Sequence, residues 1–151
     1  MRQSLIESKF PNLSEINYKI TSPYSKNYNC IAWVVGETDR WWWPDPYYQY
    51  YWPYNIPRTN TLDCFIKAFT TLGYKISTTE KYEKGFEKIA LFAKNNLPTH
   101  AARQLESGHW TSKLGPQEDI EHFDLKSIEG QDYGKVTVIL KRRKNITTYY
   151  S

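Results

Sequence analysis

The chain has 151 residues, a length that favours one domain with one core. Charged residues make up 24% and hydrophobic residues 40% of the composition, as is typical of soluble globular proteins, and no apolar run approaches the roughly 18 residues of a membrane span. The net charge of +4 comes partly from the basic run 141–144. This run indicates either a solvated strand end or a patch for anions. Because no pattern typical of a nucleic-acid module accompanies it, we expect no nucleic-acid partner.

The N-terminal segment is polar and lacks the apolar stretch of a secretory signal peptide. We therefore expect a cytoplasmic protein, with export by a leaderless route as an open alternative. The two cysteines, Cys30 and Cys64, are expected to be free thiols in a reducing compartment. The sequence predicts one domain over 1–151, whose first part, 1–28, is an irregular lead-in with a short helix near 4–9.

A helix is predicted where the lead-in ends. Asn29 can cap a helix over 30–35, and Gly36 can end it. A second helix follows Thr61, since four apolar residues recur there at spacings of three and four, and Gly73 ends it. The first of these helices begins with a cysteine, which makes its N-terminus a candidate site for thiol chemistry.

An aromatic loop is predicted between the two helices, over 37–60. Three prolines between positions 41 and 54 exclude a regular central strand or a long helix there. The tryptophans at 41–43 are expected to fold back as a hydrophobic lid, because each aromatic ring buries much apolar area. Alternatively, the rings line a groove in which a glycan or peptide stacks, and for 47–52 we expect a mixed role.

The remainder of the chain predicts mostly strands. Gly108 follows Ser107 in a hairpin turn, so a two-residue turn places Gln104 opposite Thr111, whereas a three-residue turn places it opposite Ser112. The expected strands are 74–77, 87–94, 99–106, 109–114 and 136–142, and helical turns are expected over 117–123 and 125–128.

The order of these elements brings a cysteine and a histidine into a suggestive arrangement. Cys30 opens a helix, and His100 lies at the start of a later strand. A thiolate is the nucleophile in thiol hydrolases, and a helix N-terminus together with a nearby imidazolium lowers the pKa of the thiol. The sequence therefore predicts Cys30 as nucleophile and His100 as general base.

Several short motifs resemble a bacterial family of domains of unknown function, which we identify as DUF7689-like. The resemblance covers roughly 20–142 and implies little biochemistry. The motifs are Tyr-Asn-Cys-Ile-Ala-Trp at 28–33, Gly-Glu-Thr-Asp-Arg-Trp-Trp-Trp-Pro at 36–44, Tyr-Trp-Pro at 51–53, His-Ala-Ala-Arg-Gln at 100–104 and Trp-Thr-Ser-Lys-Leu-Gly at 110–115.

More distantly, the layout is similar to papain-like NlpC/P60 cysteine hydrolases. This similarity implies an α+β fold with N-terminal helices packed on an antiparallel sheet of about four strands. It implies Ser112 or Asp119 as a third catalytic residue beside Cys30 and His100, with His122 also within reach of the site. Support for an oxyanion is expected from Asn27, Asn29 and Gln104, and substrate contacts from Trp42, Trp43, Tyr48, Trp52, Arg103 and Lys113. No metal and no cofactor are expected.

Three functional hypotheses follow. The first is a cysteine amidase or peptidase that acts through an acyl-enzyme on a peptide or another amide, such as a peptidoglycan fragment or a protein. The second is a catalytically inactive module that binds a peptide, glycan or protein through the aromatic loop. The third is a toxin or effector domain with the same thiol chemistry. Selective alkylation of Cys30 over Cys64 near neutral pH separates the second hypothesis from the other two.

Overall fold

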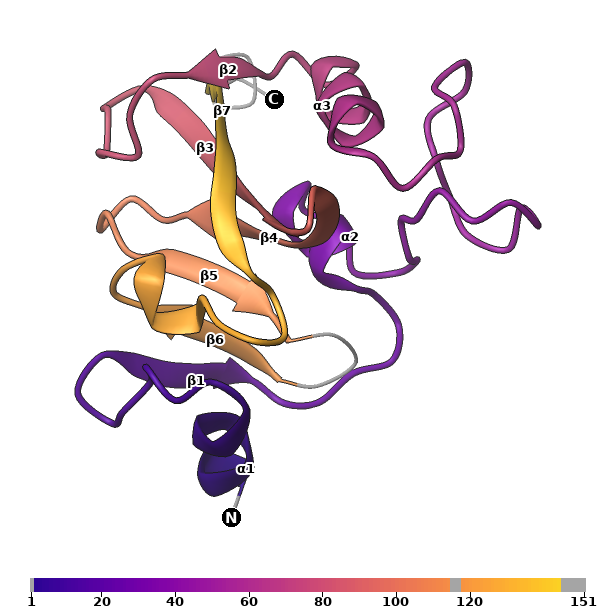
Figure 1. Cartoon of the computed structure of the whole chain (residues 1–151). Helices are drawn as coiled ribbons and strands as arrows, with labels where there is room; N and C mark the ends of the chain where they lie inside the picture. The colour runs from indigo at the N-terminus through magenta and orange to yellow at the C-terminus, as the bar shows by residue number, and fades with distance from the viewer. Residues whose placement is uncertain (1, 115–117, 145–151) are drawn as a thin grey trace.

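The computed structural model describes residues 2–114 and 118–144, and within them a seven-stranded antiparallel sheet forms the body of the molecule (Figure 1). The strand order is β1-β6-β5-β4-β3-β7-β2. Along the chain the elements are α1 (Arg2–Lys9), β1 (Tyr18–Ser22), α2 (Cys30–Val34), α3 (Leu62–Thr70), β2 (Lys75–Ser77), β3 (Phe86–Lys94), β4 (Leu97–Gln104), β5 (Trp110–Lys113), β6 (Asp119–His122), the 3-10 helix η1 (Lys126–Ile128) and β7 (Lys135–Arg143).

The expected papain-like fold, with N-terminal helices on a sheet of about four strands, is wrong. The sheet has seven strands and the helices are few and short. Three of the additional pairings come from segments whose apolar pattern is weak. Residues 18–22 of the lead-in form edge strand β1, 119–122 form β6 where a helical turn was expected, and β2 pairs with β7 at the other edge. Residue 117 of that expected turn lies outside the described residues.

Strand β3 is the centre of the fold because it is buried on both faces. Its apolar run from Ile89 to Phe92 is continuous rather than alternating, as is typical of a strand covered on both sides. Ile89 and Leu91 belong to one core cluster, whereas Ala90 and Phe92 belong to a second one on the other face. Each face of the sheet therefore has its own apolar cover.

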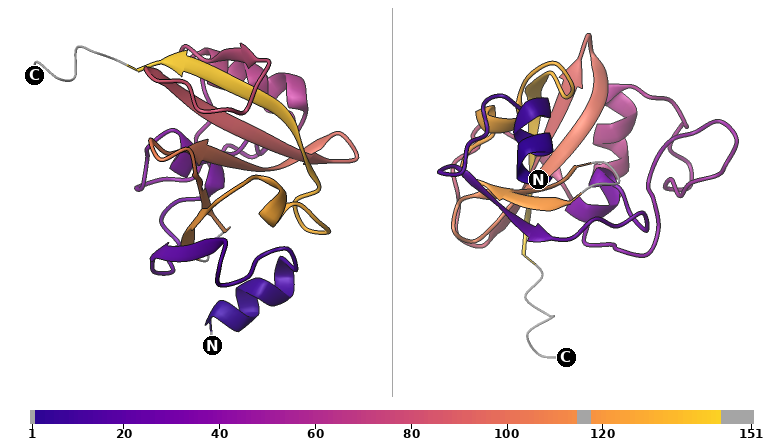
Figure 2. Two further views of the ribbon diagram at one scale, coloured as in Figure 1. Left: turned by 90° about the vertical axis from the view of Figure 1, so that its left-hand side faces the viewer. Right: turned by 90° about the horizontal axis from the view of Figure 1, so that it is seen from below.

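The first cluster lies under α2, α3 and the aromatic loop, and the second lies under α1, η1 and the segments around them. Figure 2 shows η1 and α3 on opposite sides of the sheet. The aromatic loop has no helix or strand of its own and projects beyond α2 and α3 (Figure 1). In the described part of the chain, none of the helices has the length and apolar character that crossing a membrane requires.

The hairpin between β4 and β5 differs from both expected registers. The amide of Leu105 donates to the carbonyl of His109, so these two residues enclose a three-residue turn, 106–108, which begins one residue earlier than the expected turn at 107. As a result Gln104 pairs with Trp110, and Arg103 pairs with Thr111. This register decides which side chains of the two strands share a face.

Candidate functional site

Helix α2 begins at Cys30 because Asn29 caps it. The Asn29 side-chain oxygen accepts from the amide of Ala32 at 3.1 Å. The same side chain also holds the aromatic loop, since it accepts from the amide of Trp42 at 3.1 Å and donates to the Trp42 carbonyl at 2.8 Å. With these three hydrogen bonds, Asn29 serves as a structural clamp between α2 and the loop.

The Cys30 thiol is buried against strand β4. Burial raises the pKa of this thiol to about 11, although hydrogen bonds from the backbone N–H groups of Ala101 and Ile31, together with the charge of Lys113, work in the opposite direction. The group is therefore a neutral thiol at pH 7. Both cysteines are free, as expected, and both are buried.

His100 lies on the other face of the sheet from Cys30. Successive strand residues point to opposite faces, and Ala101 belongs to the first core cluster together with Cys30. The His100 ring instead packs against Phe92 and Tyr133 on the side of the second cluster. Its Nδ1 atom has no hydrogen-bond partner, so the predicted bond between His100 and Cys30 is not formed.

His100 instead belongs to a buried series of hydrogen bonds, which we call the histidine chain and which crosses strands β4, β5 and β6. Its Nε2 atom is 2.9 Å from Ser112 Oγ, and that oxygen is 2.8 Å from Nε2 of His122. The Nδ1 atom of His122 is 2.8 Å from the carbonyl oxygen of Asp124. All three linked side chains are fully buried.

The hydrogen bond between His122 and the Asp124 carbonyl determines which atom is the donor in each bond of the histidine chain. Burial holds the pKa of His100 well below its ordinary value and lowers that of His122 to about 4, so both rings are neutral at pH 7. The Asp124 carbonyl can only accept, so His122 carries its proton on Nδ1 and accepts from Ser112 through Nε2. Ser112 in turn accepts from the Nε2–H of His100. The Nδ1 atom of His100 is then a bare acceptor.

Tyr133 covers His100, a contact that sequence reasoning missed. The two rings are parallel within 3° with their centroids 4.0 Å apart. Tyr133 is held there because the hydroxyl of Thr99 donates to its carbonyl and because Gly130 and Gly134 exchange backbone hydrogen bonds across the loop. No signal in the sequence pointed to this contact.

The side chains that share the α2 face with Cys30 are Lys113, Asp119 and Tyr28. Tyr28 donates to Asp119 Oδ2 at 2.7 Å, while the other carboxylate oxygen, Oδ1, is buried without a hydrogen-bond partner. Burial lowers the pKa of Lys113, and its ammonium donates to the carbonyl of Ser25 at 2.8 Å. Asp119 therefore anchors Tyr28 and does not contact the histidine chain.

The remaining predicted polar residues have structural contacts. Gln104 donates to the carbonyl of Glu80 at 3.0 Å, and Arg103 lies over the ring of Trp33 at 5.3 Å. Thr111 accepts from the indole N–H of Trp33 at 3.1 Å, and Asn27 is exposed at the entry to α2. Within the described residues, no group of three or more His, Cys, Asp and Glu side chains is arranged to hold a metal ion.

The tryptophans and most of the tyrosines of the aromatic loop differ in burial. Trp42 and Trp52 are buried in the first core cluster, and Trp43 is half-buried against Phe65 of α3, so the lid expected at 41–43 is confirmed for Trp42. Trp42 also donates through its indole N–H to Glu37 at 2.8 Å. These rings form core, whereas four tyrosines of the loop are exposed, namely Tyr47, Tyr48, Tyr50 and Tyr54.

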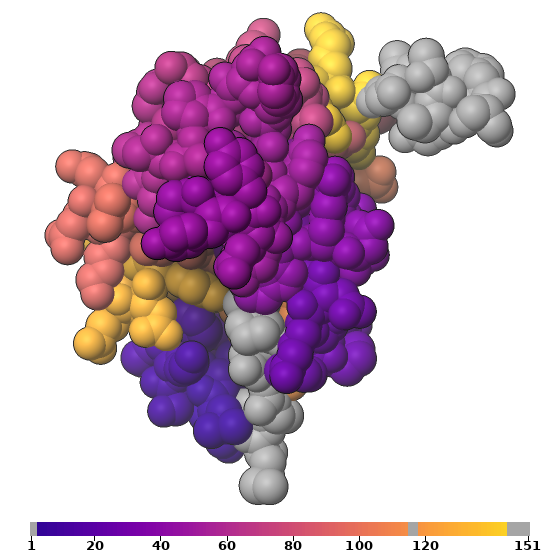
Figure 3. Space-filling model, turned by 90° about the vertical axis from the view of Figure 1, so that its right-hand side faces the viewer, coloured from indigo at the N-terminus to yellow at the C-terminus, as the bar shows by residue number. Residues whose placement is uncertain are grey.

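We define the tyrosine loop as residues 44–58. The exposed fractions of Tyr47, Tyr48 and Tyr54 are 82%, 77% and 88%, and Tyr50 is also exposed. In the space-filling view, the segment that contains this loop occupies the centre of the face (Figure 3). Four tyrosines within eight positions thus stand in solvent on one projecting segment.

The tyrosine loop is held rigid by Asp45 and Arg58. Asp45 accepts from the amides of Gln49 and Tyr50 at 2.8 and 3.0 Å, and Arg58 donates to the Asp45 carboxylate at 3.0 Å and to the Tyr50 carbonyl at 2.9 Å. Loss of water raises the pKa of Asp45, but the two amides and Arg58 outweigh it and bring the pKa below its usual value. Arg58 also lies 4.2 Å from the ring of Tyr48. The Asp-Pro pair at 45–46 is a turn signal that could have predicted this frame.

A family model described as Domain of unknown function (DUF7689) matches residues 19–141. The chain belongs to this family. The match runs from β1 into β7 and so includes residues of all seven strands of the sheet. No curated protein and no solved structure matches the chain, and the expected similarity to NlpC/P60 hydrolases has no support from these comparisons.

Proposed function

We propose that this DUF7689 chain is a binding module whose tyrosine loop recognises a peptide segment of a partner protein. The observation that supports the proposal is the exposure of Tyr47, Tyr48 and Tyr54 on a loop fixed by Asp45 and Arg58. Tyrosine supplies a large amphipathic contact area at a low cost in side-chain entropy, and it is enriched in protein recognition surfaces. A loop that is already ordered loses little further freedom on binding.

A projecting loop favours a macromolecular partner over a small ligand. Small ligands bind in concave sites that enclose them, whereas exposed rings on a projecting loop offer contacts that a longer peptide segment can use along its length. The tyrosine hydroxyls and rings can pair with backbone groups and apolar side chains of a peptide. The buried, neutral thiol of Cys30 gives the hydrolase hypothesis less support, because the nucleophile of such an enzyme is a thiolate.

The test selects peptides from a displayed random library against the parent chain and measures their affinity by fluorescence anisotropy. The loop variant carries Tyr47→Ser, Tyr48→Ser and Tyr54→Ser. The control variant carries Leu5→Gln and Ile16→Gln, two residues that are also well exposed but lie outside the loop. We expect the loop variant to bind selected peptides at least about tenfold more weakly, since each lost aromatic contact costs on the order of 1 kcal/mol, and the control to bind like the parent.

Two outcomes contradict this proposal. Selected peptides that bind the loop variant as tightly as the parent exclude the tyrosine loop as the recognition surface. A glycan array on which the parent binds in a loop-dependent manner, with no loop-dependent peptide, excludes the peptide assignment.

A separate measurement addresses the thiol chemistry. Native protein is treated with iodoacetamide at pH 7, and the modified cysteines are identified by mass spectrometry. We expect Cys30 to react only at the rate of unfolding, since its thiol is buried with a pKa of about 11. Rapid modification of Cys30 ahead of Cys64 in the folded chain contradicts a non-catalytic role and favours the hydrolase hypothesis.

A further inference from the structure

A surface hollow of about 590 Å³ lies at the end of β7, far from the tyrosine loop. Strand β2, the beginning of β3 and the segment after α3 surround it. The lining residues are Leu72, Gly73, Lys75, Phe86, Lys141, Arg142 and Arg143. Four of these seven residues are cationic, so the hollow combines a positive rim with an apolar wall.

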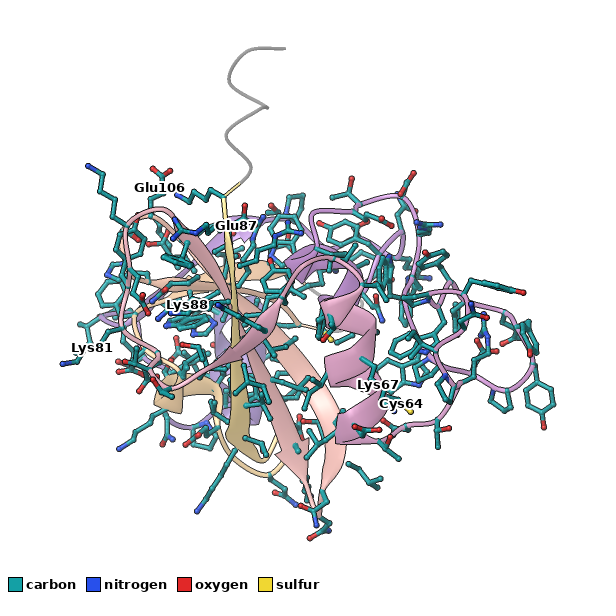
Figure 4. All side chains as sticks on the ribbon, turned by 90° about the horizontal axis from the view of Figure 1, so that it is seen from above. Cys64, Lys67, Lys81, Glu87, Lys88 and Glu106 are labelled. Atoms are coloured by element: carbon teal, nitrogen blue, oxygen red, sulfur yellow. The ribbon has the colours of Figure 1, made fainter. Side chains whose placement is uncertain are left out.

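Arg142 is a fixed part of the wall. Its guanidinium donates to the Leu72 carbonyl at 2.8 Å and to Glu87 Oε2 at 3.1 Å, and it lies 4.6 Å from the ring of Tyr74. Figure 4 looks onto this end of the molecule and labels Glu87 beside the end of β7. The guanidinium donors of Arg142 are taken by protein acceptors, so Arg142 forms part of the wall of the hollow. It also supplies a hydrogen-bond donor to the Leu72 carbonyl just after the end of α3.

The ammonium group of Lys141 has only a long ion pair within the protein. It shares Glu83 with Lys88, and its ammonium is 3.3 Å from that carboxylate, compared with 2.8 Å for Lys88. Lys88 is fully buried and donates also to the carbonyls of Thr79 and Lys81, so it points toward the 78–85 loop that carries Lys81 (Figure 4). Glu83 is therefore mainly the partner of Lys88. Much of the positive charge of Lys141 is then not compensated by Glu83 and contributes to the positive potential of the hollow.

Lys75 and Arg143 have no carboxylate partner in the part of the chain that the structure describes, and both are exposed. Arg143 lies over one aromatic ring of the hollow, Phe86, at 5.2 Å, and Lys141 lies over the same ring at 4.7 Å. Lys75 stands directly opposite Lys141 in the ladder between β2 and β7. Like charges directly opposite each other destabilise a sheet, so an anion bound between them would relieve this repulsion.

We propose that this hollow binds a ligand with two linked phosphoryl groups, contacted by Lys75, Lys141 and Arg143. As cross-strand neighbours, Lys75 and Lys141 have Cα atoms about 5 Å apart. The Cα atoms of Lys141 and Arg143 are about 7 Å apart along one strand. Three cations spread over this span match two anionic groups better than one. Arg143 offers a planar fork for bidentate contact with phosphoryl oxygens, and the two lysines act as point charges.

The test titrates inorganic pyrophosphate into the full chain and follows binding by calorimetry at low ionic strength. The variants are Lys75→Gln and Arg143→Gln. The matched control is Lys9→Gln, which removes an equal charge from the exposed end of α1. We expect each pocket variant to bind pyrophosphate at least about fivefold more weakly than the parent, the control to bind like the parent, and orthophosphate to bind at least about fivefold more weakly than pyrophosphate. Thermal melts establish that the variants are folded.

A nucleoside diphosphate titrated in parallel distinguishes the two sources of this chemistry. Tighter binding than pyrophosphate supports a nucleotide, and equal or weaker binding supports a free diphosphate. Three results overturn the proposal. They are unchanged affinity in both pocket variants, an equal loss in Lys9→Gln, and orthophosphate binding as tight as that of pyrophosphate.

Discussion

Ser112 shows how one hydroxyl can link two buried imidazoles. A hydroxyl both donates and accepts, so it can join two neutral histidines that carry their protons on opposite sides of the bond. The arrangement brings serine and histidine together as in a hydrolase, but both side chains are fully buried and the serine lies between two rings. Its consequence is structural, because a proton gained by His122 at Nε2 removes the acceptor of the Ser112 hydroxyl.

Acid should therefore destabilise the fold through His122. Burial lowers its pKa to about 4, whereas the unfolded chain titrates near the ordinary value of 6.5. Between these values the unfolded state binds a proton that the folded state does not, so the unfolding free energy rises with pH. The contribution is complete above pH 6.5 and is lost as the pH falls toward 4, by about 3 kcal/mol. Urea unfolding at pH 7, 6, 5 and 4 measures it, and burial of His100 acts in the same direction.

Two variants test the assignment of this pH dependence. His122→Asn keeps a donor for the Asp124 carbonyl but removes the titrating ring, so the unfolding free energy should fall less steeply with acid, and the part due to His100 should remain. His109→Gln serves as the control, because His109 is only partly buried and pairs with Glu121. An unfolding free energy that stays constant between pH 7 and 4 in the parent rules out the mechanism.

Among the elements, the loop between η1 and β7 depends most on a single glycine. Gly134 has a φ of 71°, and a Cβ atom added there would collide with the carbonyl of Ala93 at the end of β3. This close approach allows the loop to pack on the β3–β4 hairpin and place Tyr133 over His100. The requirement is thus both conformational and steric.

A pair of glycine variants separates these two requirements. Gly36, which follows α2, also has a positive φ of 84°, but an added Cβ atom would meet nothing within 4 Å. We expect Gly36→Ala to lower the unfolding free energy by about 1 kcal/mol through φ alone and Gly134→Ala by more than about 3 kcal/mol through φ and the backbone collision. Guanidinium unfolding at pH 7 compares the two, and equal losses would show that the collision relaxes without cost.

For the whole molecule, the sheet order predicts a gradient of local stability. Strand β3 pairs with β4 and β7 and is buried on both faces, whereas β1 and β2 lie at the two edges of the sheet. Edge strands have one hydrogen-bonded neighbour and open at a lower free energy than central ones.

Native-state hydrogen exchange followed by mass spectrometry measures this gradient. We expect peptides from β3 and from the part of β7 that pairs with it to exchange slowest, at rates set by global unfolding. Peptides from β1 and β2 should exchange faster by at least about tenfold, because about 1.4 kcal/mol less is needed to open them. Exchange of β1 as slow as that of β3 would mean that α1 and its neighbours lock the edge into the core.

Local features of the sequence determined the helices and the central strands. Asn29 and Thr61 each accept from the amide three residues ahead, and they cap α2 and α3 as predicted. The strand predicted over 87–94 is present as β3. These predictions are confirmed because helix capping and strand-forming patterns depend on residues a few positions apart.

The tertiary structure decided the sheet and the candidate sites. The edge strand β1 contacts β6 across about a hundred positions, and no local pattern marks that pairing. Because neighbouring residues of a strand point to opposite faces, Ala101 lies beside Cys30 while His100 lies on the other side of the sheet. The turn between Leu105 and His109 sets which residues of β5 stand opposite β4. Likewise, burial of Trp42 and exposure of Tyr48 depend on the clamp at Asn29 and the Asp45–Arg58 frame. Composition fixes how many rings a loop carries, but only long-range contacts determine which of them remain in solvent.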